Sequence, residues 1–148
     1  MMLRADVGPI EQLLDAVAKW AASRNDILGI ALIGSWARGA ATAASDVDLI
    51  ILAAQPDVFR DANWPNEIPW TAQTHAVGCH DVKYGAVWSR HVQLSNACEI
   101  EFSFAERSWA ATDPVDRSTL AIIRAGFRIL VDKEARLAGL QAAAQIEN

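Results

Sequence analysis

The chain has 148 residues, of which 52% are hydrophobic, and this length and composition predict a single domain over residues 1–148 with a sizeable core. The net charge of -5, with lysine and arginine scattered singly, argues against tight nucleic-acid binding, because neutralising phosphates requires a basic patch. No basic-then-apolar segment stands near the start and no apolar run reaches about 18 residues, so we expect a cytoplasmic protein that is neither secreted nor inserted into a membrane.

The first predicted elements are a helix and a strand. Apolar residues recur at helical spacing over residues 10–23, with charged residues between them, which predicts an amphipathic helix covering one face of a sheet. Residues 27–33 are mostly apolar and β-branched, which is typical of a buried strand. That strand should end at Gly34 and Ser35, where a short helix could begin.

The turn that begins at Gly34 has the residues of an anion site. Free N–H groups at a helix start attract phosphate, and Gly34 lets it approach the backbone without a Cβ in the way. Ser35 adds a hydroxyl donor, and Arg38 shares a face with Ser35 on a short helix. Taken alone, the segment could equally be an ordinary strand-to-helix turn.

Two acidic residues stand at the entrance of the next apolar strand. Side chains alternate along a strand, so Asp46 and Asp48 should project from one face while Val47 and Leu49 project from the other. Two such carboxylates repel each other unless a cation lies between them, and Mg²⁺ prefers oxygen ligands. The alternative is a solvated strand entrance, but the apolar run over residues 49–54 argues against it, because a buried strand holds its first residues rigidly.

Residues 57–75 are the least regular segment and predict a loop with short helical turns. Loops on rigid scaffolds often carry specificity, so Trp64, Trp70 and Tyr84 are candidates for stacking on a base or an acceptor. The alternative is that these rings close the edge of the core.

A second set of candidates is charged. Lys83 and Arg90 should lie on strands beside the expected site and could contact triphosphate or acceptor, although solvated surface charge is the default for both. The three histidines, His75, His80 and His91, show no ligand spacing, which favours core or surface roles.

The next segments predict a hairpin. Residues 87–94 and 98–104 alternate in polarity on either side of an Asn-containing turn at 95–97. Glu99 and Glu101 share a face of the second strand, and Glu101 lies further from the turn. Beyond the hairpin, helices are predicted near 115–125 and 137–146, with a strand at 127–131 between them.

The combination of Gly34-Ser35, ten intervening residues and Asp46-x-Asp48 resembles the signature of the DNA polymerase beta superfamily of nucleotidyltransferases. Gly34-Ser35-x-x-Arg38-Gly39 is similar to the phosphate-binding turn of the polymerases. The block from Ser45 to Leu49 is similar to that of the streptomycin and kanamycin nucleotidyltransferases and of small stand-alone nucleotidyltransferase domains.

This resemblance implies an α+β fold with a mixed sheet flanked by helices, which we expect to have about five strands. It also implies two Mg²⁺ ions bridged by Asp46 and Asp48, and a third carboxylate on a neighbouring strand. We prefer Glu101, because Glu101 to Phe104 resembles the pattern of the resistance enzymes. Glu99 remains the alternative, as a metal ligand, a supporting group or a general base.

The implied reaction is attack of a hydroxyl on the α-phosphate of a nucleoside triphosphate, with pyrophosphate leaving. The first hypothesis is transfer of AMP from ATP to a small acceptor such as an aminoglycoside or lincosamide. The others are an antitoxin-like enzyme that modifies a helical partner protein, and a nucleotide-binding module without turnover. Because only a short helix follows the core, the acceptor pocket could require a second copy of the chain or another protein.

Overall fold

The computed structural model describes residues 7–42, 45–71, 73–84 and 87–146. In these ranges six strands form one mixed sheet in the order β3-β4-β5-β2-β1-β6. The strands are β1 (Ile27–Ile33), β2 (Val47–Ala53), β3 (Ala76–Tyr84), β4 (Val87–Leu94), β5 (Glu99–Ala105) and β6 (Phe127–Asp132). β2 and β5 run parallel, and the other neighbouring pairs are antiparallel.

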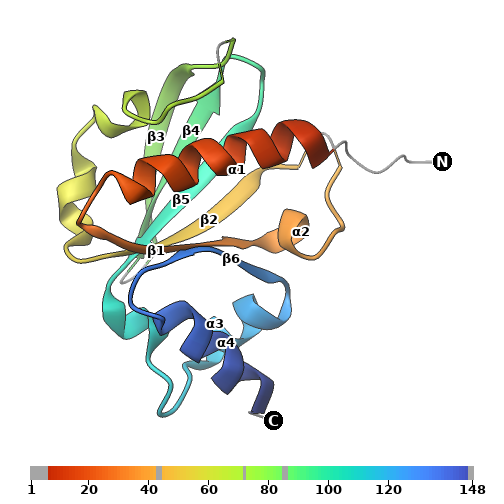
Figure 1. Ribbon diagram of the computed structural model, residues 1–148, viewed down its shortest axis with the longest axis vertical. Helices are drawn as coiled ribbons and strands as arrows, with labels where there is room; N and C mark the ends of the chain where they lie inside the picture. The colour runs from red at the N-terminus through yellow and green to blue at the C-terminus, as the bar shows by residue number, and fades with distance from the viewer. Residues whose placement is uncertain (1–6, 43–44, 72, 85–86, 147–148) are drawn as a thin grey trace.

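Helices cover both faces of this sheet. The α-helices are α1 (Val7–Ala22), α2 (Gly34–Ala37), α3 (Arg117–Arg124) and α4 (Arg136–Ile146), and three 3-10 turns are η1 (Pro56–Arg60), η2 (Trp64–Asn66) and η3 (Arg107–Ala110). Figure 1 shows α1 lying across one side of the sheet, with α3 and α4 on the other side, beyond β1 and β6. The expected α+β class and mixed sheet are confirmed.

Strand alternation divides the core into two clusters. Along β2, Leu49 and Ile51 pack with α1, whereas Ile50 and Leu52 pack with residues of η3 and α4. Because Asp48 alternates with Leu49, its side chain belongs to the face that carries η3, α3 and α4. We call this the C-terminal face, and the other the α1 face.

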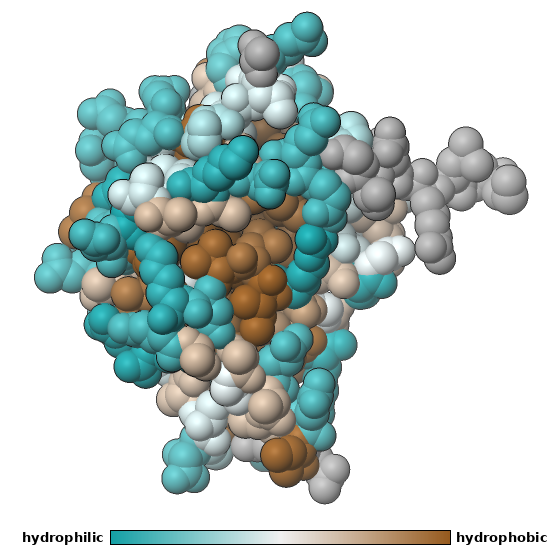
Figure 2. Space-filling model, viewed as in Figure 1, coloured by the Kyte–Doolittle hydropathy of each residue, from teal (hydrophilic) through white to brown (hydrophobic). Residues whose placement is uncertain are grey.

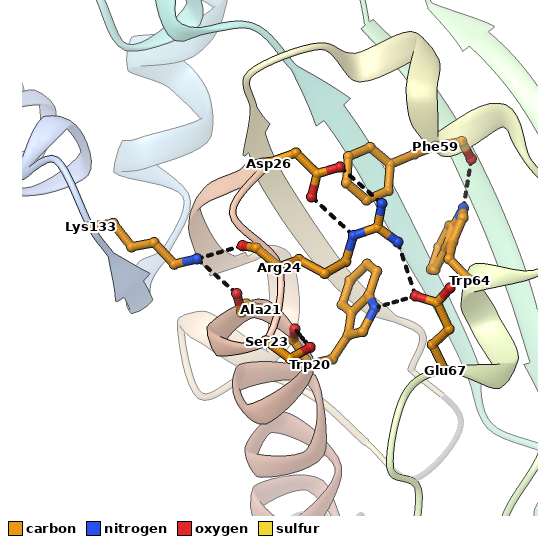
Figure 3. A network of polar contacts seen from close by, with 9 residues as sticks. All are labelled: Trp20, Ala21, Ser23, Arg24, Asp26, Phe59, Trp64, Glu67 and Lys133. Atoms are coloured by element: carbon orange, nitrogen blue, oxygen red, sulfur yellow. Dashed lines mark hydrogen bonds and ion pairs between the residues drawn. The ribbon is translucent and has the colours of Figure 1, made fainter.

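The α1 face is closed by aromatic rings and a polar network. Trp20 stacks on Trp64 with ring centroids 5.1 Å apart, and the Trp64 indole N–H donates to the carbonyl of Phe59 at 2.6 Å. Figure 3 shows Arg24 beside these rings, where its guanidinium donates to both Asp26 and Glu67. The network ties the end of α1 to the loop that follows η2.

The elements agree with the sequence analysis except at one edge of the sheet. The loop after β2 contains only the short turns η1 and η2, as expected. The sheet has a sixth strand because residues 76–84 pair with β4 as β3, although they contain a glycine and several charged side chains. Their strand conformation follows from pairing rather than from an apolar pattern.

The opposite edge of the sheet is β6, which contains four partly buried apolar residues: Phe127, Ile129, Leu130 and Val131. Figure 2 shows apolar side chains gathered over β6, between α1 and the C-terminal helices. Within the described ranges, no helix combines the length and hydropathy that crossing a bilayer requires.

Candidate active site

The turn between β1 and α2 lies directly against the second aspartate. Gly34 has a φ of +74°, and a Cβ built on it would lie 2.7 Å from Oδ2 of Asp48. The antiparallel pairing of β1 with β2 causes this approach, because it places Ile33 opposite Asp48. Glycine is therefore required at position 34 by the backbone conformation and by the carboxylate beside it.

Acidic residues from two strands meet on the C-terminal face. The parallel pairing of β2 with β5 makes Asp48 and Glu101 direct neighbours, and the β4–β5 pairing places His91 on the other side of Glu101. Asp46 is exposed just before β2 begins. The sheet register thus brings together the carboxylates of Asp46, Asp48 and Glu101 from positions far apart in the sequence.

The pKa of Asp48 reflects the negative charges that surround it. Burial, followed by repulsion from Glu101 and Asp46, raises the pKa of Asp48 to about 6, against the opposing effect of His91. A divalent cation would relieve the same repulsion, and carboxylate oxygens are the donors that Mg²⁺ prefers. The donor set on the C-terminal face therefore fits a hard divalent ion.

Glu99 and Glu101 differ in their surroundings. Both Glu99 oxygens have partners: the Gln93 amide donates to Oε1 at 2.5 Å, and Nδ1 of His91 lies 3.3 Å from Oε2. The hydrogen bond from Gln93 is the main cause that lowers the pKa of Glu99. Glu101 accepts a 3.3 Å hydrogen bond from the Ser103 hydroxyl at Oε1, its Oε2 lies 3.0 Å from Nε2 of His91, and it is the direct neighbour of Asp48.

Among the described residues, no three His, Cys, Asp or Glu side chains are grouped closely enough to enclose a metal ion. The carboxylates that the sequence analysis selected are neighbours in the sheet, and in this arrangement they form no closed cage.

A cavity of about 710 Å³ opens beside Glu101 on the C-terminal face. Its walls come from the sheet, from η3 and from the start of α3. The lining residues are Ile33, Ile50, Val87, Glu101, Ser103, Ala105, Glu106, Ser108, Trp109, Asp116, Ser118, Thr119 and Ile122. Three of these residues are acidic and none is lysine or arginine, so the cavity offers carboxylates and hydroxyls to an occupant.

The remaining turn residues are placed as follows. Ser35 is partly buried and Arg38 is exposed, and within the described ranges no ion pair involves the Arg38 guanidinium. Gly39 also has a positive φ, of +72°. The Ser45 hydroxyl accepts a 3.0 Å hydrogen bond from the backbone N–H of Thr42, and its carbonyl accepts one from the indole of Trp36. Ser45 therefore supports the loop before β2.

Two candidates for stacking belong to the core of the α1 face. Trp64 is only 1% exposed, because it packs against Trp20 and Phe102, so it presents no ring face to a ligand. Trp70 packs against the same core and donates to the carbonyl of Pro65 at 2.9 Å. The expected stacking role of Trp64 is corrected, because this ring closes the edge of the core. Trp70 is partly buried, and its expected stacking role stays a prediction. The side chain of Tyr84 lies outside the described residues.

Arg90 is also on the α1 face and is 3% exposed. Its guanidinium binds both oxygens of Asp81, at 2.7 and 3.1 Å, and donates to the carbonyls of Asp61 and Arg60. The expected contact with triphosphate or acceptor is corrected, since the side chain is buried and all three of its nitrogens donate inside the protein. Lys83 is exposed and lines a smaller cavity of about 260 Å³, which shares Glu106 with the cavity beside Glu101, so its expected contact with the acceptor stays a prediction.

His91 is the residue that the sequence analysis missed. Its ring lies between Glu99 and Glu101, with Nε2 3.0 Å from Oε2 of Glu101, and the His80 ring stacks on it with centroids 4.6 Å apart. The hairpin contained a usable signal, because a turn centred on residue 96 places residue 91 opposite residue 101. Ligand spacing along the chain could not show a pairing across strands.

Comparisons with known proteins identify the family of the chain. Residues 10–110 match the family described as "Nucleotidyltransferase domain". Among solved structures, the chain is similar to the apo form of a CCA-adding enzyme, with 13% identity and a TM-score of 0.45 over 94% of this chain and 33% of that one. The chain thus spans about a third of that enzyme. No curated protein matches it. The chain belongs to the nucleotidyltransferase domain family.

Proposed function

We propose that the protein transfers a nucleoside monophosphate, AMP from ATP, to a hydroxyl of a small acceptor such as an aminoglycoside or lincosamide, with Mg²⁺ as cofactor and pyrophosphate as product. The observation that carries this proposal is the pairing of Asp48 with Glu101 between the Gly34 turn and an acidic cavity. The turn that would bind phosphate contacts Asp48, and the cavity that would hold the acceptor is lined by Glu101.

Asp46, Asp48 and Glu101 are the residues that would hold the divalent ions. Two bound ions supply positive charge that stabilises the attacking and leaving oxygens of the transferring phosphoryl group. The protein contributes position: β2 and β5 hold Asp48 and Glu101 side by side, and the Ser103 hydroxyl supports one oxygen of Glu101. The raised pKa of Asp48 supports this assignment, because it reflects negative charge gathered without a counterion.

The triphosphate would lie along the α2 turn. Gly34 packs directly against the Asp48 carboxylate, so a triphosphate bound along the backbone of this turn would lie beside the ions that Asp48 would hold. Ser35 offers a hydroxyl donor, and Arg38 offers a guanidinium for charge-assisted hydrogen bonds. Gly39 ends the turn with a second positive φ.

The acceptor would occupy the cavity beside Glu101. The carboxylates of Glu106 and Glu101 favour a cationic occupant, and the serine and threonine hydroxyls favour one that carries hydrogen-bonding groups. The partly buried Trp109 provides an apolar wall on which a sugar ring can pack. An amine-bearing polyol combines these properties, which supports the aminoglycoside class over a phosphorylated acceptor.

A direct test incubates the protein with Mg²⁺, ATP or GTP, and a panel of aminoglycosides, lincosamides and neutral polyols. Mass spectrometry should find nucleotide on an amine-bearing acceptor, with pyrophosphate released in equal amount. Glu101→Gln should abolish transfer. Glu134 lies in an exposed ion pair outside the cavity, so the Glu134→Gln variant should keep its transfer activity. Transfer to a protein in place of every small acceptor, or equal transfer by Glu101→Gln, would contradict the proposal.

A further inference from the structure

The imidazole of His91 lies between two carboxylates of the candidate site, although the proposed reaction assigns no role to a histidine. It comes from β4, opposite Glu101, and its side chain is only 14% exposed. Nδ1 faces Glu99 and Nε2 faces Glu101. The ring therefore lies between one carboxylate whose oxygens are both occupied and one assigned to bind an ion.

The hydrogen bond at Nδ1 decides which nitrogen carries a proton. The Gln93 amide donates to Oε1 of Glu99, which is the contact of a carboxylate, and a carboxylate can only accept. Nδ1 of His91, 3.3 Å from Oε2 of Glu99, must then be the donor. In the neutral ring this leaves a lone pair at Nε2.

Nε2 differs from Nδ1 in having no hydrogen-bond partner. It is buried, and among the described residues it has no hydrogen-bond partner. Oε2 of Glu101 lies 3.0 Å away, but the contact lacks the direction of a hydrogen bond. Burying a nitrogen without a hydrogen-bond partner costs free energy, and a group that binds both this nitrogen and the neighbouring carboxylate oxygen would remove that cost.

We infer that His91 is a nitrogen ligand, through Nε2, of the divalent ion held by Glu101, so that this position binds Mn²⁺ or Co²⁺ in preference to Mg²⁺. The arrangement Gln93–Glu99–His91 is that of a supporting carboxylate which fixes the tautomer and orientation of a ligating histidine. Mixed nitrogen and oxygen donors favour transition metals, whereas Mg²⁺ prefers oxygen alone.

His91 and Glu101 supply two donors to this ion, and among the described residues no third side chain completes a metal cage around them. His80 stacks on the far side of the ring and restricts its rotation. The inference rests on the proposed metal-dependent transfer, because it assigns a ligand to an ion that this reaction requires. It also makes Glu99 a supporting residue and leaves Glu101 as the third carboxylate.

The test uses Mn²⁺ as the probe, with and without a non-hydrolysable ATP analogue, and pulsed electron paramagnetic resonance as the readout. Bound Mn²⁺ should show nitrogen coupling from a directly ligated imidazole. His91→Asn should remove this coupling while its amide keeps the position of Nδ1 next to Glu99. The same variant should weaken Co²⁺ binding by about tenfold or more in calorimetry and leave Mg²⁺ binding nearly unchanged.

His75→Asn is the matched control, because His75 is exposed and outside this cluster, and it should keep the nitrogen coupling. Mn²⁺ binding without nitrogen coupling in the wild type would overturn the assignment of His91 and leave the carboxylate site standing. It would mean that the imidazole only bridges Glu99 and Glu101. Absence of any Mn²⁺ binding, even with nucleotide, would overturn both the assignment and the proposed metal-dependent reaction.

Discussion

Asp48 and Glu101 are direct neighbours across the parallel pair β2–β5, and the charge of Glu101 contributes to the raised pKa of Asp48. This is the only parallel pairing among the described strands. Because residues paired across neighbouring strands project from the same face of a sheet, two acidic positions from different parts of the chain meet on the C-terminal face. The fold thus carries an electrostatic penalty at the candidate metal site.

Asp48→Asn should therefore stabilise the metal-free protein at pH 7. The folded-state pKa of Asp48, about 6, lies above the ordinary value of 3.8, so the folded protein binds this proton more tightly than the unfolded chain does. That contribution to stability is fully present below pH 3.8 and is lost as the pH rises through 6. After allowance for solvent screening, we expect a gain on the order of 1 kcal/mol for the variant at pH 7.

Urea unfolding in a chelator, at pH 4 and at pH 7, measures this effect. The difference between Asp48→Asn and wild type should appear at pH 7 and shrink at pH 4. Asp15→Asn, an exposed aspartate of α1, should show no comparable change. A variant less stable than wild type at pH 7 would mean that the Asp48 carboxylate is favourably solvated or paired.

Gly34→Ala should damage both stability and transfer. The residue would have to hold a φ of +74° and place its Cβ 2.7 Å from Oδ2 of Asp48. We expect a loss of about 1–2 kcal/mol in the free energy of unfolding, with activity falling further because the carboxylate is displaced.

Gly139→Ala is a sharp control for that substitution. Gly139 lies within α4, and a Cβ there would meet nothing within 4 Å, so alanine should stabilise the protein by up to about 1 kcal/mol. Thermal unfolding of both variants gives the comparison. Equal effects of the two alanines would show that the contact with Asp48 does not constrain position 34.

The carboxylates could be anticipated from the sequence because local rules govern them. Alternation along a buried strand defines the shared face of Asp46 and Asp48, and a hairpin turn defines that of Glu99 and Glu101. The structure places Asp48 beside Glu101 as neighbours, but the strand order that achieves this is not a local property. Only the pairing of β2 with β5, strands separated by a long loop and a hairpin, creates the contact.

The errors have the same origin. Trp64 and Arg90 were expected near the site because they lie between its motifs in the sequence, yet both face α1. For Arg90, strand alternation with the buried Trp88 and Val92 could have indicated the core face. For Trp64, an irregular loop offers no such periodicity, and only tertiary packing decides which layer it joins.

Arg90→Met should separate stability from function. The substitution removes the paired hydrogen bonds to Asp81 and two carbonyl contacts, and leaves those carbonyls without their donor. We expect a loss of about 2 kcal/mol, below the range for fully buried pairs because Asp81 is 39% exposed. Activity per folded molecule and the KM for ATP should stay near wild-type values, because the side chain faces away from the carboxylates. A raised KM for ATP with unchanged urea stability would restore Arg90 as a substrate contact.

Glu106→Gln should weaken binding of the acceptor and leave binding of the nucleotide unchanged. Glu106 is exposed, lines the larger cavity, and is not among the carboxylates that neighbour Asp48. Removing its charge should raise the KM for an amine-bearing acceptor severalfold, with the KM for ATP unchanged, and the difference should shrink as salt screens the interaction. Steady-state kinetics at two ionic strengths measures both constants.

Glu67→Gln is the matched control, since Glu67 is an exposed carboxylate of the α1 face, and it should leave the acceptor KM unchanged. If Glu106→Gln lowered the acceptor KM or changed only the KM for ATP, the cavity would hold something other than a cationic acceptor.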